Sequence, residues 1–228
     1  MKVEIWSDIM CPFCYIGKRR FEQALNQFEY ADEVKVEWRS FQLNPDMETA
    51  PNASINEYLA ESKGWSLNEA RQMNERVTKM AAEEGLEYHM DQAVVANSFD
   101  AHRLIQFAKS NDLGDEAEET LFQAYFTEGK NMDDTDTLVE IAEQIGLVTQ
   151  ETREVLKSDQ YAKAVQHDIQ TAQAMNIRGV PFFLFNRKFA VSGAQESETF
   201  LKALKQSWND WVEKQEAEEE PATEKQAN

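Results

Sequence analysis

The sequence predicts an α/β protein in which a β-α-β unit and a β-β-α unit are separated by a large all-helical insertion. Three observations support this expectation. Strand-type alternation flanks a helical pattern in residues 3–43, helical spacing dominates residues 55–175, and two short apolar runs precede a helical pattern in residues 181–212. The 228 residues, of which 42% are hydrophobic, suffice for one domain or for one domain carrying an insertion.

The β-α-β unit occupies the N-terminal part of the chain. Residues 3–7, Val-Glu-Ile-Trp-Ser, alternate and are rich in strand formers. A helical pattern follows over about residues 12–28, and residues 34–43 form the second expected strand. A helical crossover of this kind joins parallel strands with a right-handed connection. The sequence therefore places residues 11–14, Cys-Pro-Phe-Cys, at the start of the crossover helix.

The insertion is expected over residues 51–177, where helical spacing replaces strand alternation. Residues 66–69, Ser-Leu-Asn-Glu, match a capping box, and Gly85 is a suitable C-cap for the helix that follows. Further helices are expected at about residues 98–111, 115–128, 135–145 and 151–175.

The β-β-α unit is expected after the insertion. Residues 181–185 and 189–192 predict two strands joined by a turn near Asn186, and residues 196–212 predict a final helix. Residues 213–228 are acidic and lack an apolar pattern, which predicts a disordered tail. The expected domains are 1–50 plus 178–212 for the sheet domain, 51–177 for the helical insertion domain and 213–228 for the tail.

The charge of the chain narrows the classes of partner. Its 42 acidic and 23 basic side chains give a net charge of −19, which disfavours binding to nucleic acid and to anionic membranes. No stretch approaches the roughly 18 apolar residues that a membrane span requires. The first residues lack the basic start and apolar run of a secretory signal, so we expect a cytoplasmic protein. The sequence does not indicate an oligomeric state.

The cysteine content favours redox chemistry. The only two cysteines are three positions apart, so they cannot form a structural disulfide framework. A structural zinc site needs four ligands, and His89, His102 and His167 are too scattered to complete one. Metal binding and inert thiols stay as the less favoured interpretations, and we expect neither a metal nor a cofactor.

The position of the pair at a helix start gives a physical reason for thiolate formation. Disulfide exchange requires a thiolate, and the unpaired N–H groups and dipole at a helix N-terminus stabilise negative charge. We expect Cys11 at the N-cap, with its sulfur accepting hydrogen bonds from the N–H groups of Phe13 and Cys14. Pro12 then occupies the first helical position, which tolerates its missing N–H. Cys11 is the expected nucleophile and Cys14 the resolving cysteine.

Pro12 and three further residues, Phe13, Val180 and Pro181, are expected to contact the substrate. Phe13 adds no positive charge to the site, so it either limits the oxidising power of the pair or forms an apolar lip. Pro181 opens an apolar run, so it belongs at the start of a strand. The exposed backbone of Val180 is then able to bind an extended substrate chain.

Several separated motifs agree in order and spacing with one family. They are Ser7-Asp8-x-x-Cys11-Pro12-Phe13-Cys14-Tyr15-x-Gly17, Phe41-x-Leu43-x-Pro45, Asn97-x-x-x-Ala101-His102-Arg103, Gly179-Val180-Pro181-Phe182-Phe183 and Val191-Ser192-Gly193-Ala194-Gln195. Over residues 3–210 the chain resembles the FrnE-like branch of the DsbA family, in the thioredoxin-like superfamily. The resemblance implies a thioredoxin-like core with a helical insertion, and dithiol–disulfide oxidoreductase or isomerase activity on protein disulfides or small thiols. It also implies a cis Val180–Pro181 bond, because in a thioredoxin-like core this loop lies beside the cysteine pair.

The chain departs from this branch at Phe13, where the family commonly has tryptophan. A related branch, the hydroxychromene-carboxylate isomerases and kappa-class glutathione transferases, uses glutathione and usually has serine at the position of Cys11. Cys11 argues against that branch, although glutathione stays a candidate co-substrate. Glutathione-dependent isomerisation or transfer, and a redox-switched chaperone-like role, are the alternative functions.

Three other sites have two interpretations each. His102 either lines the cleft and assists proton transfer or packs within its predicted helix. Asp8 either accepts a proton from Cys14 or shapes the loop between strand and helix. The basic cluster 18–20, Lys-Arg-Arg, either attracts an acidic substrate or forms a solvated helix face.

Overall fold

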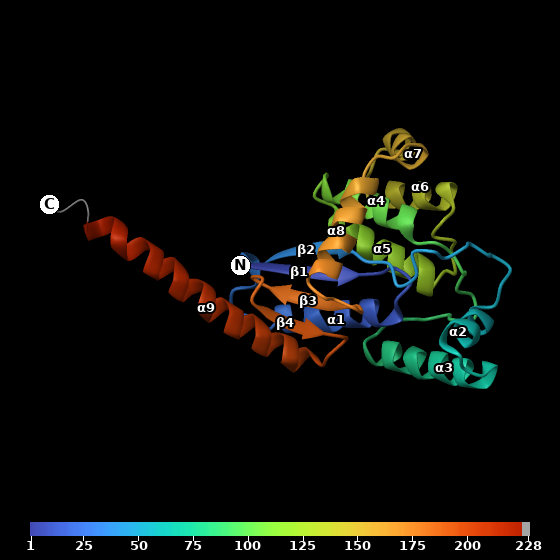
Figure 1. The fold of residues 1–228 in the computed structure, drawn as a ribbon, viewed down its shortest axis with the longest axis horizontal. Coiled ribbons are helices and arrows are strands. Elements are labelled where there is room, and N and C mark those ends of the chain that lie inside the picture. The colour runs from blue at the N-terminus through green and yellow to red at the C-terminus, as the bar shows by residue number, and fades with distance from the viewer. Residues whose placement is uncertain (225–228) are drawn as a thin grey trace.

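A four-stranded mixed sheet lies at the centre of the computed structural model, which describes residues 1–224 (Figure 1). Its strands are β1 (Lys2–Ser7), β2 (Lys35–Ser40), β3 (Phe182–Phe185) and β4 (Phe189–Ser192), in the order β2-β1-β3-β4. β1 and β2 are parallel, whereas β3 is antiparallel to both β1 and β4. This arrangement confirms the predicted β-α-β and β-β-α units.

The two faces of the sheet bury alternate residues of each strand. Val3, Ile5 and Phe183 join the cluster under α1 (Pro12–Leu25) and α9 (Ser197–Glu224). Trp6 and Leu184 point to the opposite face, where they pack against Ala172 of α8 (Ala162–Ala174). Figure 1 shows α1 and α9 on one side of the sheet and α8 on the other. Period-two alternation in the strands is what places a hydrophobic layer on each face.

The insertion forms a helical layer whose core extends to the cysteine loop. The capping box at Ser66 and Glu69 is confirmed, with both reciprocal hydrogen bonds present. A single apolar cluster joins Cys11 and Cys14 to residues of the insertion such as Phe122. The remaining elements are η1 (Ala31–Glu33), α2 (Ile55–Lys63), α3 (Leu67–Glu83), α4 (Phe99–Lys109), α5 (Gly114–Phe126), α6 (Thr135–Gln144) and α7 (Thr149–Lys157).

Two predicted elements are wrong in their extent. The helix expected over residues 151–175 is broken between α7 and α8, where Ser158 is extended and Tyr161 has a φ of 62°. The guanidinium of Arg103 stabilises this break, because it donates hydrogen bonds to backbone carbonyls at the end of α7 and in the connection. The strand expected over residues 34–43 ends at Ser40, since the chain then turns toward the cysteine loop.

The last helix extends beyond its predicted end. α9 continues to Glu224, so residues 213–224 are helical where we expected a disordered tail. Residues 213–220 consist of glutamate, lysine, glutamine and alanine, which are strong helix formers, and Lys214 pairs with Asp210 one turn earlier at 3.0 Å. Residues 225–228 of the predicted tail lie outside the described residues. Figure 1 shows the end of α9 projecting away from the sheet.

Within residues 1–224, none of the helices combines the length and apolar character that crossing a bilayer demands.

Candidate active site

The two cysteines lie where β1 leads into α1. Cys11 is the N-cap residue, with extended backbone angles of −95° and 109°, and Pro12 is the first helical residue, as predicted. Cys14 lies in the first turn and is 1% exposed, whereas Cys11 is 4% exposed. Both thiols are free. The sequence therefore places the pair at the positive end of a helix dipole, with Cys11 as the outer thiol.

The hydrogen bonds of Cys11 differ from the prediction. The N-cap side chain forms no capping hydrogen bond, so the sulfur does not accept from the N–H groups of Phe13 and Cys14. The N–H of Cys14 donates instead to the Cys11 carbonyl at 3.0 Å. As a thiol, Cys11 donates to the carbonyl of Val180, with a distance of 3.6 Å between Sγ and the oxygen. A protonated sulfur is a donor, which explains why it turns toward a carbonyl.

Val180 and Pro181 form the wall opposite the cysteines. The Val180–Pro181 peptide is cis, and the Pro181 carbonyl accepts from Gly193 N–H at 2.8 Å. Gly17 of α1 allows this approach, because a Cβ there would lie 2.9 Å from Pro181 Cγ. Among residues 1–224, the Val180 N–H has no hydrogen-bond acceptor, so it is free for a substrate backbone.

Cys14 is in surroundings that oppose its ionisation. Burial raises the pKa of its thiol well above the usual range, and the nearby Cys11 adds to this effect. The Asp8 backbone N–H and the Ser7 hydroxyl act in the opposite direction, because they favour the thiolate. The buried Ser7 hydroxyl forms no hydrogen bond within the described chain, so it is available to a thiolate. Cys14 is therefore a thiol until a reaction requires it to ionise.

Asp8 connects the cysteine loop to the insertion. Its carbonyl accepts from Cys11 N–H at 2.9 Å. Its carboxylate accepts from the backbone N–H groups of Met10, at 3.2 Å, and Leu43, at 2.7 Å. His102 of α4 lies behind it, with 3.5 Å between Nε2 and Asp8 Oδ1. The structure thus brings His102 to the cysteine loop through Asp8.

Tyr88 is a site residue that the sequence did not reveal. Its hydroxyl donates to the Pro12 carbonyl at 2.8 Å, between the two cysteines. Its ring stacks on Phe126 at 4.6 Å and on Tyr15 at 6.1 Å between centroids. Burial raises the pKa of this hydroxyl, and the charge of Cys11 adds to the shift. No sequence signal marked Tyr88, because it follows α3 in a segment without periodicity and reaches the site by tertiary packing.

A cavity of about 260 Å³ borders the cysteine loop on the side of the insertion. Asp8 and Met10 of the loop line it, together with Leu43 and with Tyr125 of α5. Phe13, between the two cysteines in the sequence, is 37% exposed, and its contact with substrate stays a prediction. The site therefore combines two thiols, a free backbone N–H and an apolar recess.

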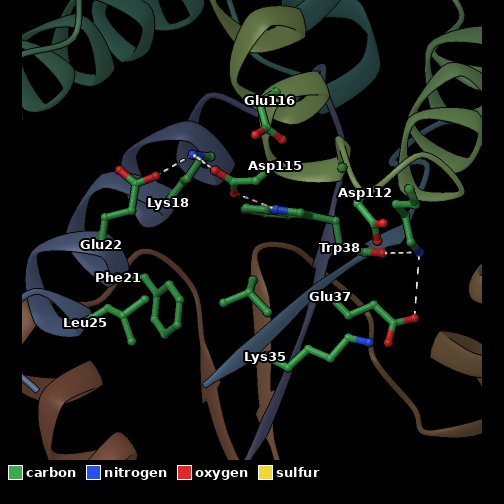
Figure 2. Close-up of a pocket in the computed structure, with 13 residues that line it drawn as sticks. Lys18, Phe21, Glu22, Leu25, Lys35, Glu37, Trp38, Asp112, Asp115 and Glu116 are labelled. Carbon is green, nitrogen blue, oxygen red and sulfur yellow. Dashed lines mark hydrogen bonds and ion pairs between the residues drawn. The ribbon is translucent and has the colours of Figure 1, made fainter. Parts of the chain in front are cut away.

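A larger cavity, of about 580 Å³, lies away from the cysteines between α1, β2 and α5 (Figure 2). Lys18 points into it and forms ion pairs with Glu22 and Asp115, and Asp115 also accepts from Trp38 Nε1. Arg20, from the same basic cluster, is paired with Glu84 at 2.6 Å. The cluster 18–20 is therefore neither a solvated face nor a free anion site, because two of its cations are buried in ion pairs.

The other histidines lie outside this site. His89 binds the Thr127 carbonyl at 2.7 Å, and His167 is on an exposed turn of α8. Within the described part of the chain, no group of three or more histidine, cysteine, aspartate and glutamate side chains is arranged to hold a metal ion.

Comparisons with known proteins agree with this geometry. A profile of the DSBA-like thioredoxin domain matches residues 2–205. A probable DsbA oxidoreductase of Streptomyces coelicolor, SCO1869, is 38% identical, with a TM-score of 0.86 over 92% of this chain and 90% of that one. Uncharacterized protein YwbO of Bacillus subtilis (strain 168) is 28% identical over 204 residues, 89% of this chain and 94% of YwbO.

A more distant structure shares the fold. The cytosolic disulfide reductase DsbM of Pseudomonas aeruginosa, solved with GSH, is 14% identical, with a TM-score of 0.64 over 92% of this chain and all of that one. The predicted thioredoxin-like architecture with a helical insertion is confirmed by these matches. The chain belongs to the DSBA-like thioredoxin domain family.

Proposed function

We propose that this protein is a thiol–disulfide oxidoreductase that exchanges disulfides with protein or small-thiol substrates through Cys11 and Cys14. The observation that carries the proposal is the placement of two free thiols at the start of α1, facing Val180 and Pro181. The 38% identity with a probable DsbA oxidoreductase supports the same class of reaction.

The burial of the two sulfurs supports different roles for them. Cys11 is the outer thiol, so its thiolate attacks a substrate disulfide, forms a mixed disulfide and expels the second substrate sulfur as a thiolate. Cys14 then loses its proton and attacks Cys11 Sγ, which releases the first substrate sulfur and leaves the Cys11–Cys14 disulfide. Because burial holds the pKa of Cys14 high, Cys14 does not compete as the first nucleophile.

The residues around the pair support binding of an extended substrate. The free N–H of Val180 is placed to donate to a backbone carbonyl of the substrate, as in the addition of a strand. Phe13, two residues after Cys11, offers an exposed apolar contact, while the Pro12 carbonyl is already engaged by Tyr88. We further propose that the protein belongs to the FrnE-like branch, that it is cytoplasmic and that glutathione is a co-substrate. The description of DsbM as a cytosolic disulfide reductase, solved with GSH, supports the last two of these proposals.

Serine substitutions of the two cysteines test this function. In an insulin-reduction assay coupled to glutathione, we expect Cys11→Ser to lose at least about 100-fold in rate, because a hydroxyl is not ionised near neutral pH. Cys14→Ser keeps the nucleophile, so it is expected to accumulate the Cys11 mixed disulfide, detected by mass spectrometry without reductant.

The two variants control for each other, because each removes one buried sulfur from the same loop. Retention of full activity by Cys11→Ser would show that the nucleophile is wrongly assigned. Failure of Cys14→Ser to trap a mixed disulfide would show that Cys14 does not resolve it.

A further inference from the structure

Residues 178–180, Arg-Gly-Val, form an uncovered segment beside the cysteines. The Val180 carbonyl accepts from the Cys11 thiol, with 3.6 Å between the oxygen and Sγ. None of the three N–H groups of this segment has a hydrogen-bond acceptor among residues 1–224. A Cβ added to Gly179 would meet no atom within 4 Å beyond its own chain neighbours, so the segment faces open space there. The backbone of residues 178–180 is therefore free to pair with a chain that reaches Cys11.

Arg178 adds a cation to this segment. Its side chain is exposed, and it forms no ion pair with any acid in the part of the chain that the structure describes. Its Nε–H donates to Asn176 Oδ1 at 2.9 Å, which holds the guanidinium near the end of α8. Neither Nη group forms a hydrogen bond to a described residue, so both are free to donate. Two parallel N–H groups of this kind match the two oxygens of a carboxylate.

The other charged groups near the cysteines are already satisfied. The basic cluster 18–20 is held in ion pairs with Glu22, Glu84 and Glu119. The Asp8 carboxylate is buried and accepts from two backbone N–H groups. Although the chain carries a net charge of −19, charges more than about 8 Å apart are largely screened at physiological salt. A substrate that passes residues 178–180 is therefore attracted by the cation that it touches.

Arg178 is also close enough to act on residues next to a substrate cysteine. Two residues of chain span at most about 7 Å, which limits the distance between the Cα atoms of Arg178 and Val180. A substrate strand that pairs with Val180 therefore passes Arg178 within about two residues of the cysteine that is bound to Cys11.

We propose that Arg178 is a specificity-determining residue, which favours substrate polypeptides that carry a glutamate or aspartate within two residues of the reacting cysteine. The substrate carboxylate accepts from the two free Nη groups, while a substrate backbone carbonyl accepts from the Val180 N–H. This inference rests on the proposed function and adds to it the charge of the preferred substrate.

Blocked pentapeptides of the pattern Xaa-Ala-Cys-Ala-Xaa test this preference, where Xaa is glutamate, glutamine or lysine. The peptide cysteine is joined to pyridine-2-thiol in a mixed disulfide, which is the two-electron oxidant. The Cys11 thiolate attacks the peptide sulfur and expels pyridine-2-thiolate, which absorbs as the thione after it gains a proton. Cys14 then loses its proton and bonds to Cys11 Sγ, and the peptide leaves as a thiolate. Each rate of thione release is divided by the rate of the same peptide with dithiothreitol.

The charge on the peptide should determine this normalised rate. At about 0.05 M salt we expect the wild type to react at least about threefold faster with the glutamate peptide than with the lysine peptide, which is the scale of an exposed ion pair. The preference should shrink at about 1 M salt, because salt screens exposed charges. Arg178→Glu should reverse the order of the two peptides. Arg178→Lys should keep the order with a smaller ratio, because an ammonium group lacks the paired donors.

Lys163→Glu is the matched control, since it makes the same change of charge at an exposed position about 16 Å along α8 from Ala174. It should keep the wild-type order of the peptides. Equal normalised rates for the glutamate and lysine peptides in the wild type would overturn the proposal, and so would an unchanged order in Arg178→Glu. If the wild type released thione no faster than Cys11→Ser with every peptide, the proposed function itself would fail.

Discussion

Glu118 is a residue whose buried carboxyl group links stability to pH. It lies on α5, 1% exposed, and its Oε2 has no hydrogen-bond partner among residues 1–224. Burial is the main cause that raises its pKa from 4.5 to about 8, and the positive charge of Lys18 only partly opposes this. The folded state therefore holds a proton that the unfolded chain releases between those two values.

This difference predicts the effect of Glu118→Gln. Between pH 4.5 and 8 the folded protein binds more protons than the unfolded chain, so the wild type loses stability as pH rises through this window. The loss is on the order of 1.4 kcal/mol per pH unit. Glutamine cannot ionise, so the free energy of unfolding of Glu118→Gln relative to wild type should increase from pH 4.5 to 8 and then level off. Urea unfolding at several pH values measures it.

The exposed neighbour Glu116 provides the control for this experiment. Glu116→Gln changes the same functional group on the same helix, but its side chain is in water. Its stability relative to wild type should therefore show no comparable rise across the window. Parallel pH curves for Glu118→Gln and wild type would contradict the prediction.

At the scale of residues, the sequence predicted those parts of the site that are local in the chain. Cys11 and Cys14 are adjacent in the sequence to the helix start that holds them, and Pro181 opens its own strand. Ser7 and Tyr88 were missed, because their roles depend on which side chains meet after folding. The predicted hydrogen bonds of Cys11 were wrong for the same reason. Its thiol donates instead to the Val180 carbonyl, which lies 169 positions away in the chain.

At the scale of elements, Asp168 joins three parts of the structure. It lies on α8 and accepts from Arg39 Nη1 at 2.9 Å, from Ser40 N–H at 3.1 Å and from Gln106 Nε2 at 2.6 Å. Arg39 and Ser40 belong to β2, and Gln106 belongs to α4. One buried carboxylate therefore holds the insertion against the sheet.

Asp168→Ala should destabilise the protein by about 3 kcal/mol, because it leaves the buried donors of β2 and α4 without an acceptor. Equilibrium unfolding in urea, followed by tryptophan fluorescence, measures this change. Asp159→Ala is the control, since Asp159 is exposed in the connection before α8. A loss below about 1 kcal/mol for Asp168→Ala would show that packing alone holds α8 in place.

The elements that the sequence predicted well are those with strong local signals. The capping box at Ser66 marked the start of α3 correctly, and the turn at Asn186 and Arg187 has the positive φ angles of a tight hairpin. The break between α7 and α8 was missed, because the carbonyls there are bound by Arg103 from another helix. Periodicity records which residues are apolar, and it does not record such contacts.

At the scale of the whole molecule, the cysteine loop and the insertion share one apolar cluster. The site is therefore built by both: β1 and α1 supply the thiols, while α4 and the segment after α3 supply His102 and Tyr88. The sequence predicted the order of these parts along the chain. It did not predict how the insertion packs on the sheet, because that depends on ion pairs such as the one between Arg39 and Asp168.

The helix α9 also divides into two parts with different contributions to stability. Phe200 and Leu204 are buried against the sheet, and Trp208 stacks on Tyr30 with 4.4 Å between ring centroids. Asn186 of the hairpin donates to the Ser207 hydroxyl at 3.0 Å. Beyond Trp211, the side chains of residues 213–217 are exposed. The anchoring contacts of α9 therefore end near Trp211.

Two truncations test this division. A chain ending at residue 216 keeps every anchoring contact, so its Tm should stay within about 2 °C of the full chain. A chain ending at residue 207 loses Trp208 and Trp211, and it should lose at least about 3 kcal/mol, because removing even one large aromatic side chain from a packed site costs about that much. Calorimetry measures the Tm and the free energy of unfolding of both truncated chains. Their rate of insulin reduction should be unchanged at 25 °C, because α9 does not contact the cysteines. If the chain ending at residue 216 were as unstable as the shorter one, the exposed extension would have to stabilise the fold.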